Sequence, residues 1–202
     1  MRHGAQCATI LLVLGLLAGC ATSPPSHFLV LDAVGPAQPK ITAHGEPVVV
    51  GDVEIPGYLD RPEMVRREGS HRLDISNTDR WASPLAPMIR EVLTQDLAAR
   101  LPEAMLPLAT EADRIRPLRT LAVRIEDFTA DAAGEVVLKA RWSILPESGR
   151  KAEVRRQETI KVGLKGSGAA AQADAMSRAI GILSDHIASA LSGTDQPDKS
   201  GH

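Results

Sequence analysis

The chain has 202 residues and a formal net charge of −2, so its charge gives no reason to expect nucleic-acid binding. Its hydrophobic content of 44% is ordinary for a folded domain with an apolar leader, and its length suits one domain with processed or flexible ends. The sequence contains only two Trp, two Phe and one Tyr. We therefore expect each aromatic side chain to supply contact area in a core or an interface.

Residues 1–19 have the pattern of a bacterial lipoprotein signal peptide. A short basic start precedes an apolar run, Ala8 to Leu17, that is too short to remain as a membrane-spanning helix. The run ends in Leu17-Ala18-Gly19-Cys20, which matches a lipobox. The sequence therefore predicts a covalent lipid on Cys20 and no other cofactor. The alternative is a plain signal peptide with an incidental cysteine.

The residues around Cys20 also indicate where the protein is held. Two or more acyl chains anchor a protein stably, so the mature chain is expected to be tethered to a membrane without spanning it. Ala21 follows Cys20, and the absence of Asp at this position favours the outer membrane over the inner membrane in enteric bacteria. We therefore expect attachment to the periplasmic face of the outer membrane, with residues 20–26 as the lipidated cysteine and a short Pro-bearing spacer.

The first half of the domain is expected to contain several strands. Residues 27–32 fit a first strand with Phe28 and Val30 on one face and the intervening leucines on the other. The β-branched run 47–55 predicts a second strand with a possible bulge at Gly51. Residues 64–67 could continue extended to a turn at Glu68 and Gly69, and residues 71–76 could form a short edge strand.

Two amphipathic helices are predicted. In the first, Ser83 is expected to be the N-cap and Pro84 the first helical residue, and Pro102 ends the helix. Its apolar stripe is Leu85, Ile89, Val92, Leu93, Leu97 and Leu101, with Arg90, Gln95 and Arg100 outside it. The second helix follows Gly166-Ser167-Gly168, and its expected buried face is Met176, Ala179, Ile180, Leu183, Ile187 and Leu191.

Between the helices, three runs alternate apolar and polar residues, at 120–126, 136–144 and 159–164. This alternation predicts strands with one buried face in an antiparallel meander, with turns at 131–134 and 146–149. The expected fold is α+β: a mostly antiparallel sheet of about five strands with two amphipathic helices packed on one face. Residues 27–191 would form one domain, and residues 192–202 a disordered tail.

One stretch resembles a known family. Residues 55–67 read IPGYLDRPEMVRR, and DRWASPL follows at 79–85, just before the first helix. Together these motifs resemble the PqiC/YmbA family of auxiliary lipoproteins of ABC-type and MCE-domain lipid transport systems in Gram-negative envelopes. Where family members often carry an acidic residue between the Ala and Pro of the second motif, this chain has Ser83.

The resemblance implies an interaction protein. It would dock on or cap an MCE-domain transport protein linked to the inner membrane, would support envelope integrity, and could assemble as a homo-oligomeric ring. Interface residues proposed from the motifs are Tyr58, Leu59, Asp60, Arg61, Pro62, Arg80 and Trp81. The same residues could instead be structural, with Asp60 and Arg61 fixing the turn and Trp81 packing in the core. A second functional hypothesis is a periplasmic carrier of lipid or another hydrophobic ligand, which would need an apolar pocket.

Enzymatic function is not expected. The sequence lacks the GxSxG, P-loop and HExxH patterns, and its mature part has no cysteine besides Cys20. The histidines have no metal-ligand spacing, so no metal site is predicted. Asp60, Asp74 and Asp79 could be imagined as paired catalytic carboxylates. Turn caps and ion pairs with Arg61 or Arg80 are the favoured interpretation.

Overall fold

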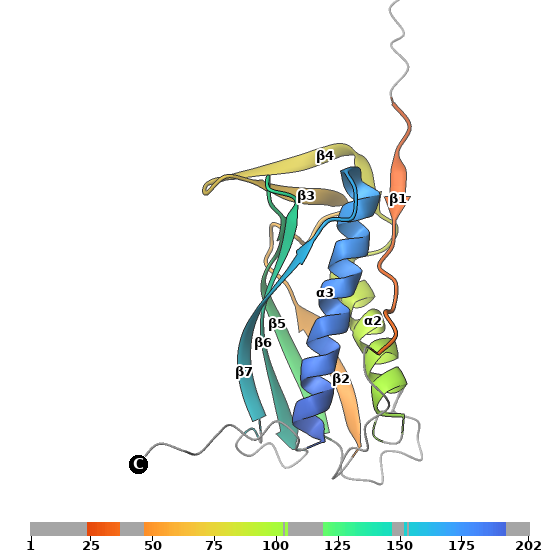
Figure 1. Ribbon diagram of the computed structural model, residues 1–202, viewed down its shortest axis with the longest axis vertical. Coiled ribbons are helices and arrows are strands. Elements are labelled where there is room, and N and C mark those ends of the chain that lie inside the picture. Colours follow the sequence, from red (N-terminus) through yellow and green to blue (C-terminus); the bar gives the residue numbers. More distant parts are fainter. Residues whose placement is uncertain are drawn as a thin grey trace, which may run out of the picture.

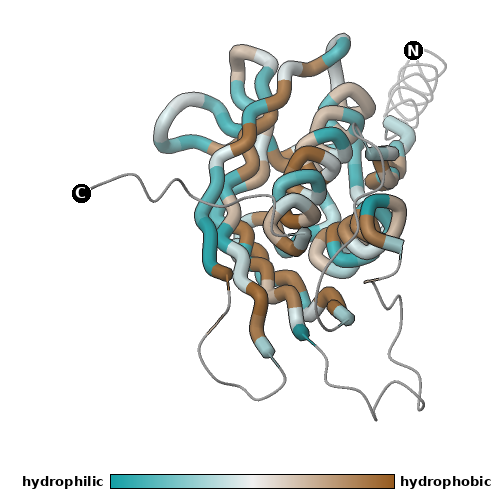
Figure 2. Tube along the Cα trace, turned by 60° about the horizontal axis from the view of Figure 1, so that its bottom comes forward, coloured by the Kyte–Doolittle hydropathy of each residue, from teal (hydrophilic) through white to brown (hydrophobic). Residues whose placement is uncertain are grey.

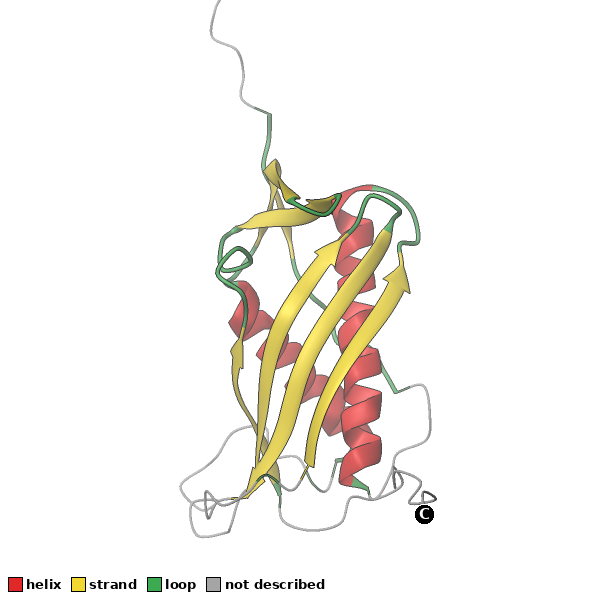
Figure 3. Cartoon of the chain, turned by 90° about the vertical axis from the view of Figure 1, so that its left-hand side faces the viewer, coloured by secondary structure: helices red, strands yellow, loops and turns green. Residues whose placement is uncertain are grey.

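The computed structural model describes residues 24–36, 47–102, 104, 119–146, 152 and 154–192. The predicted signal peptide, Cys20, residues 147–149 of the turn predicted at 146–149, and the predicted tail beyond Ser192 lie outside these residues. In the described part of the chain, seven strands form one sheet, and two helices cover one face of it (Figure 1). Figure 3 looks onto the uncovered face, with both helices behind the long strands.

The predicted meander is present and longer than expected. It consists of β5 (Arg119–Ala130), β6 (Glu135–Pro146) and β7 (Val154–Gly163), paired antiparallel in chain order. The alternate residues of β6 that were expected to face the core are all buried: Val136, Leu138, Ala140, Trp142 and Ile144. The predicted turn at 131–134 is also confirmed. The Asp131 carboxylate accepts the amides of Ala133 and Glu135 at 2.9 and 3.0 Å, and Gly134 has a φ of 80°.

The N-terminal strands pair in a way that corrects the predicted sheet. β1 (His27–Leu29) lies parallel to β4 (Arg72–Trp81), and β2 (Val48–Glu54) lies parallel to β5. β3 (Glu63–Glu68) forms an antiparallel hairpin with β4 and meets β5 in parallel at its end. The sheet is therefore mixed and seven-stranded, not mostly antiparallel with about five strands. Alternation of apolar residues indicates which side chains face inward, but it does not indicate which strand lies alongside or in which direction.

β2 and β3 share one edge of β5. β2 pairs from Val48 opposite Arg119 to Glu54 opposite Arg124, and β3 reaches the other end of β5 where Arg66 lies opposite Ala130. The register of β2 shifts between Val50 and Val53, which confirms the predicted bulge at Gly51. The segment that links β2 to β3 must therefore run beside the middle of β5.

Both predicted helices are present. α2 (Leu85–Arg100) and α3 (Gly168–Leu191) bury every residue of their predicted stripes. Figure 2 shows apolar stretches of the helices and strands gathered between the two layers. The predicted start of α2 is one residue early, because Pro84 is the N-cap and no side chain caps the helix. Pro84 has an extended ψ of 135°, so it lies just outside the helix.

Arg100 links the N-terminal segment, residues 30–36, to both helices. In the sequence pattern this arginine lies outside the apolar stripe of the first helix. Arg100 is 2% exposed; its guanidinium donates to the carbonyls of Val34 and Gly181, each at 3.0 Å, and to Asp185 at 2.6 Å. The buried Asp96 carboxylate accepts the Val34 amide at 2.7 Å. A Cβ on Gly181 would lie 3.0 Å from that of Val34, so glycine gives the segment room to cross α3.

Candidate functional site: the segment between β2 and β4

The segment 55–62, which carries the first family motif, follows the edge of β5 between β2 and β3. Two backbone hydrogen bonds tighten it: the Leu59 amide donates to Pro56 O at 2.8 Å, and the Arg61 amide donates to Leu59 O at 2.9 Å. Pro62 O then accepts the Trp81 amide at 2.7 Å, which ties the first motif to the second. The two motifs are therefore neighbours in space as well as in the family pattern.

Tyr58 fixes this segment to β5. Its hydroxyl donates to the Asp127 carboxylate at 3.1 Å and lies 3.5 Å from the carbonyl oxygen of Glu126. The register of β5 shifts between Ile125 and Asp127, so Glu126 is the extra residue of a bulge, and Tyr58 covers its carbonyl. Burial, followed by the negative charge of Asp127, raises the pKa of Tyr58 to about 12. Tyr58 therefore remains a neutral donor at physiological pH.

Asp127 is the centre of a small polar cluster that sequence reasoning missed. Besides Tyr58 it accepts hydrogen bonds from Arg67 at 3.1 Å and from the Thr129 hydroxyl at 2.9 Å. The cluster joins three parts of the chain, namely the segment 55–62, β3 and β5. The Tyr58 side chain is half-buried. The signal available in the sequence was the break in alternation after Ile125, where Glu126 and Asp127 stand together.

The charged side chains of the motifs do not pair as expected. Arg61 and Arg80 both contact Glu63, at 3.2 and 3.6 Å, instead of Asp60. A hydrogen bond with its own backbone amide, together with the one from Arg61, lowers the pKa of Glu63. Within the described residues, the exposed Asp60 side chain has no hydrogen bond or ion pair. The predicted ion pairs of Asp60 with Arg61 or Arg80 are therefore wrong, because Glu63 lies between the two arginines.

Two of the seven proposed interface residues lie inside the domain. Leu59 is 3% exposed and Trp81 is 5% exposed, so both belong to the hydrophobic core. This confirms the structural interpretation of Trp81, which packs at the end of β4 beside β1. Four others reach the surface: Asp60, Arg61, Pro62 and Arg80. The site is therefore a charged surface on a buried aromatic and aliphatic support.

Asp79 has the structural role that was favoured for it. Its carboxylate accepts the Ser76 hydroxyl at 2.8 Å and lies 3.1 Å from His27 Nδ1 in β1. The Ser76 oxygen in turn accepts the amides of Thr78 and Asp79. This network shapes the irregular middle of β4 and holds the short β1 against it. In the described ranges, no three His, Cys, Asp or Glu side chains are arranged to hold a metal ion.

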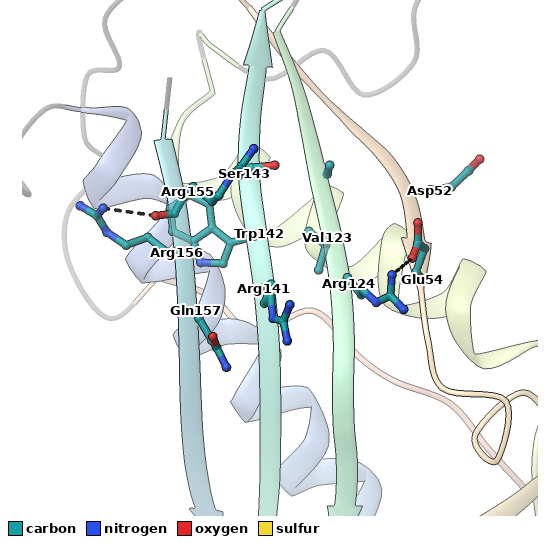
Figure 4. A pocket seen from close by; sticks show the side chains of 11 residues that line it. Asp52, Glu54, Val123, Arg124, Arg141, Trp142, Ser143, Arg155, Arg156 and Gln157 are labelled. Atoms are coloured by element: carbon teal, nitrogen blue, oxygen red, sulfur yellow. Dashed lines mark hydrogen bonds and ion pairs between the residues drawn. The ribbon is translucent and has the colours of Figure 1, made fainter. Parts of the chain in front are cut away.

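The uncovered face of the sheet carries an open hollow of about 720 Å³ across β2, β5, β6 and β7 (Figure 4). Charged side chains dominate its lining, including Arg124, Arg141 and Arg155. Arg124 pairs with Glu54 at 3.2 Å, as Figure 4 shows, and Arg141 pairs with Glu126. Such a surface suits water and charged partners better than an acyl chain. None of the helices in the described part is both long and apolar enough to cross a membrane.

Comparisons with known proteins agree with the resemblance. A family model described as "ABC-type transport auxiliary lipoprotein component" matches residues 29–188. Intermembrane transport lipoprotein PqiC of Escherichia coli (strain K12) is 28% identical over 131 residues, which cover 62% of this chain and 67% of PqiC. PqiC of Shigella flexneri matches over the same extent.

Two solved structures share the fold. Protein XCC0632 from Xanthomonas campestris superposes with a TM-score of 0.68 and 15% identity, over 84% of this chain and 97% of that one. The crystal structure of an uncharacterized protein gives a TM-score of 0.70 and 20% identity, over 83% and 99%. Because the family model spans most of the sequence and both motifs, this chain belongs to the ABC-type transport auxiliary lipoproteins, the family that includes PqiC.

Proposed function

We propose that this protein is a lipid-anchored periplasmic component of an MCE/ABC-type lipid transport system. It would be held at the outer membrane through Cys20, would dock on or cap an MCE-domain protein linked to the inner membrane, and would thereby support envelope integrity. The observation that carries the proposal is the family match over residues 29–188, preceded in the sequence by a lipobox.

The surface formed by Asp60, Arg61, Pro62 and Arg80 is the proposed contact. It is rigid, since Tyr58 bonds to β5 and the Trp81 amide bonds to Pro62 O at 2.7 Å. A rigid surface loses little conformational entropy on binding. Arg61 and Arg80 share the Glu63 carboxylate, and both of these arginine side chains are partly exposed. The surface therefore offers two cationic side chains and the exposed Asp60 carboxylate, which has no partner among the described residues, to a partner protein or a neighbouring copy in a ring.

The observations favour docking over carrying a lipid. A carrier needs an apolar pocket, and such pockets are lined mostly by hydrophobic side chains. The apolar stripes of α2 and α3 are buried in the core, and the hollow on the uncovered face of the sheet is lined mainly by arginines and carboxylates. Lipid extraction from the purified protein provides the check: stoichiometric lipid would favour the carrier.

The first test is assembly. The chain from Ala21 onward, which keeps every described residue, would be measured by light scattering over a concentration series and then by capture on a purified MCE-domain protein. We expect a discrete oligomer, capture by the MCE-domain protein, or both. A monomer at every concentration that is also not captured would contradict the proposal.

The second test locates the contact. Asp60→Ala with Arg61→Ala should leave the melting temperature nearly unchanged and weaken assembly or capture. The matched control is Glu68→Ala with Arg72→Ala, which removes one acid and one base from an exposed ion pair on the β3–β4 hairpin. Loss of cooperative unfolding in the first double variant would show that the motif acts structurally, and equal losses of assembly or capture in both would show that the effect is not specific to the motif.

A further inference from the structure

Phe28 stands apart from the other aromatic residues because its side chain is in solvent. It is 67% exposed, and Val30 beside it is 51% exposed. In contrast Phe128, Trp142 and Trp81 are at most 5% exposed, and Tyr58 is half-buried. The exposed aromatic is also the one nearest in sequence to Cys20.

The exposure of Phe28 is set by the strand and is not the result of a loose end. β1 pairs with β4 so that Phe28 lies opposite Arg80 and Leu29 opposite Trp81. The Leu29 carbonyl accepts the Ala82 amide at 2.9 Å, and the Asp32 amide donates to Ser177 Oγ at 3.1 Å. Leu31 is 6% exposed and packs in the core. Because successive side chains of an extended segment point to opposite faces, Phe28 and Val30 point outward.

An open hollow of about 410 Å³ lies beside this pair, between residues 28–34 and α3. The α3 side of the hollow is formed by small residues, Ala170 and Ala173, with Asp174 and Ser177. Asp174 is held by Arg178 at 2.9 Å, so its charge is partly compensated. Together with the exposed Asp32, it favours a zwitterionic lipid surface over an anionic one.

The tether brings this surface close to a bilayer. Phe28 follows Cys20 by eight residues, which span at most about 29 Å when fully extended. A short linker gives its ends an effective concentration in the millimolar range, so a contact too weak to bind alone is occupied when tethered. Apolar side chains at the boundary of headgroups and acyl chains gain free energy by leaving water.

We propose that Phe28 and Val30 contact the bilayer that holds the acyl chains of Cys20, so that the β1 end of the domain faces the membrane (Figure 1). This inference rests on the proposed lipid anchor. It adds a second, non-covalent contact that fixes the orientation of the domain. The proposed docking surface on Asp60 to Pro62 and Arg80 would then lie near the membrane, because Arg80 is the register partner of Phe28.

The test measures quenching of tryptophan fluorescence by brominated lipid. The chain from Cys20 onward would carry Phe28→Trp, and the Cys20 thiol would be coupled to a maleimide phospholipid in phosphatidylcholine vesicles with or without brominated acyl chains. We expect bromine to reduce the emission of the Phe28→Trp variant. The matched control is Ile182→Trp on α3, also an exposed apolar position at 37%, whose emission should not change. Trp81 and Trp142 are present in both variants. Equal emission of the Phe28→Trp variant in the two kinds of vesicle would overturn the proposal.

A second measurement separates the bilayer from a protein occupant. Phe28→Ser should leave the mass of the protein in vesicle-free buffer and its capture by an MCE-domain protein unchanged. A lower mass would assign Phe28 to a contact between copies, and loss of capture would assign it to the partner protein; either result would overturn the proposal. Chemical coupling makes the vesicle test independent of lipidation in cells. The anchor itself is tested by Cys20→Ser, which should release the protein from the outer membrane.

Discussion

Strands β5 to β7 and strands β1 to β4 belong to one sheet, but different contacts hold them in place. β5, β6 and β7 follow one another and pair in long antiparallel registers, and α3 packs against β6 and β7. β1 and β2 instead meet strands far away in the sequence, as His27 meets Asp79 and Val48 meets Arg119, and β3 meets the distant β5 in addition to its hairpin with β4. Here polar side chains provide the specific links: Tyr58 and Arg67 on Asp127, and Arg100 on Val34.

Strands that are neighbours in the sequence can pair through alternation and a tight turn, whereas remote strands need contacts that identify one partner. A buried hydrogen bond does this because an unpaired donor or acceptor is costly. Breaking the polar links should therefore loosen the N-terminal strands and leave the meander intact. The three predictions below test this, starting with the largest expected effect.

Arg100→Met should lower the free energy of unfolding by about 3–5 kcal/mol, because Asp96 would stay buried without its cation. Urea denaturation measures the loss. Hydrogen exchange should show the Val34 amide losing protection while the amides of β6 keep theirs. Arg178→Met is the control, since its ion pair with Asp174 is solvent-exposed and should be worth less than about 1 kcal/mol. Similar losses in both variants would contradict a special role for Arg100.

Asp96 should make the stability of the contact between residues 30–36 and the two helices depend on pH. Burial raises the pKa of Asp96 from 3.8 to about 6, although the Val34 amide and Arg100 oppose the rise. Between these two values the folded protein holds a proton that the unfolded chain has released, so stability falls as pH rises from about 4 to about 6. The fall from this group is about 3 kcal/mol at 1.36 kcal/mol per pKa unit.

Asp96→Asn tests this sign. The stability of the variant relative to the natural protein should rise by up to about 3 kcal/mol between pH 4 and pH 7, since asparagine has no proton to lose. Urea unfolding at several pH values gives both curves. Parallel curves would show that Asp96 does not titrate in this range.

Tyr58→Phe should have the smallest effect, a loss of about 1–2 kcal/mol, because it removes one hydrogen bond to Asp127 and keeps the ring. Exchange should increase in β3 and in the segment 55–62 before it increases in β6. Asp60→Ala is the comparison: its side chain is exposed, so stability should stay within about 0.5 kcal/mol. If Asp60→Ala destabilised the domain more than Tyr58→Phe, the division of the motif into support and surface would be wrong.

Parts of the site could be predicted from the sequence, and other parts could not. The family motifs located the segment, and the position of Trp81 before the helix indicated a core residue. The role of Asp127 was hidden because its partners, Tyr58 and Arg67, are 69 and 60 residues away in the sequence. Arg100 was placed outside the stripe of α2 because the stripe assumed one buried face. The N-terminal segment adds a second covered face, and burial of the arginine follows from it.

From the amino-acid sequence alone we could predict the two helices with their buried stripes, the inward and outward faces of β5 to β7, and the family. These depend on local spacing, which is a property of the chain alone. The folded structure was needed to show the parallel pairing of β1 and β2, the sharing of Glu63 by Arg61 and Arg80, and the exposure of the Asp60 and Phe28 side chains. These depend on which distant segments meet, and side-chain periodicity carries no information about distance along the chain or strand direction.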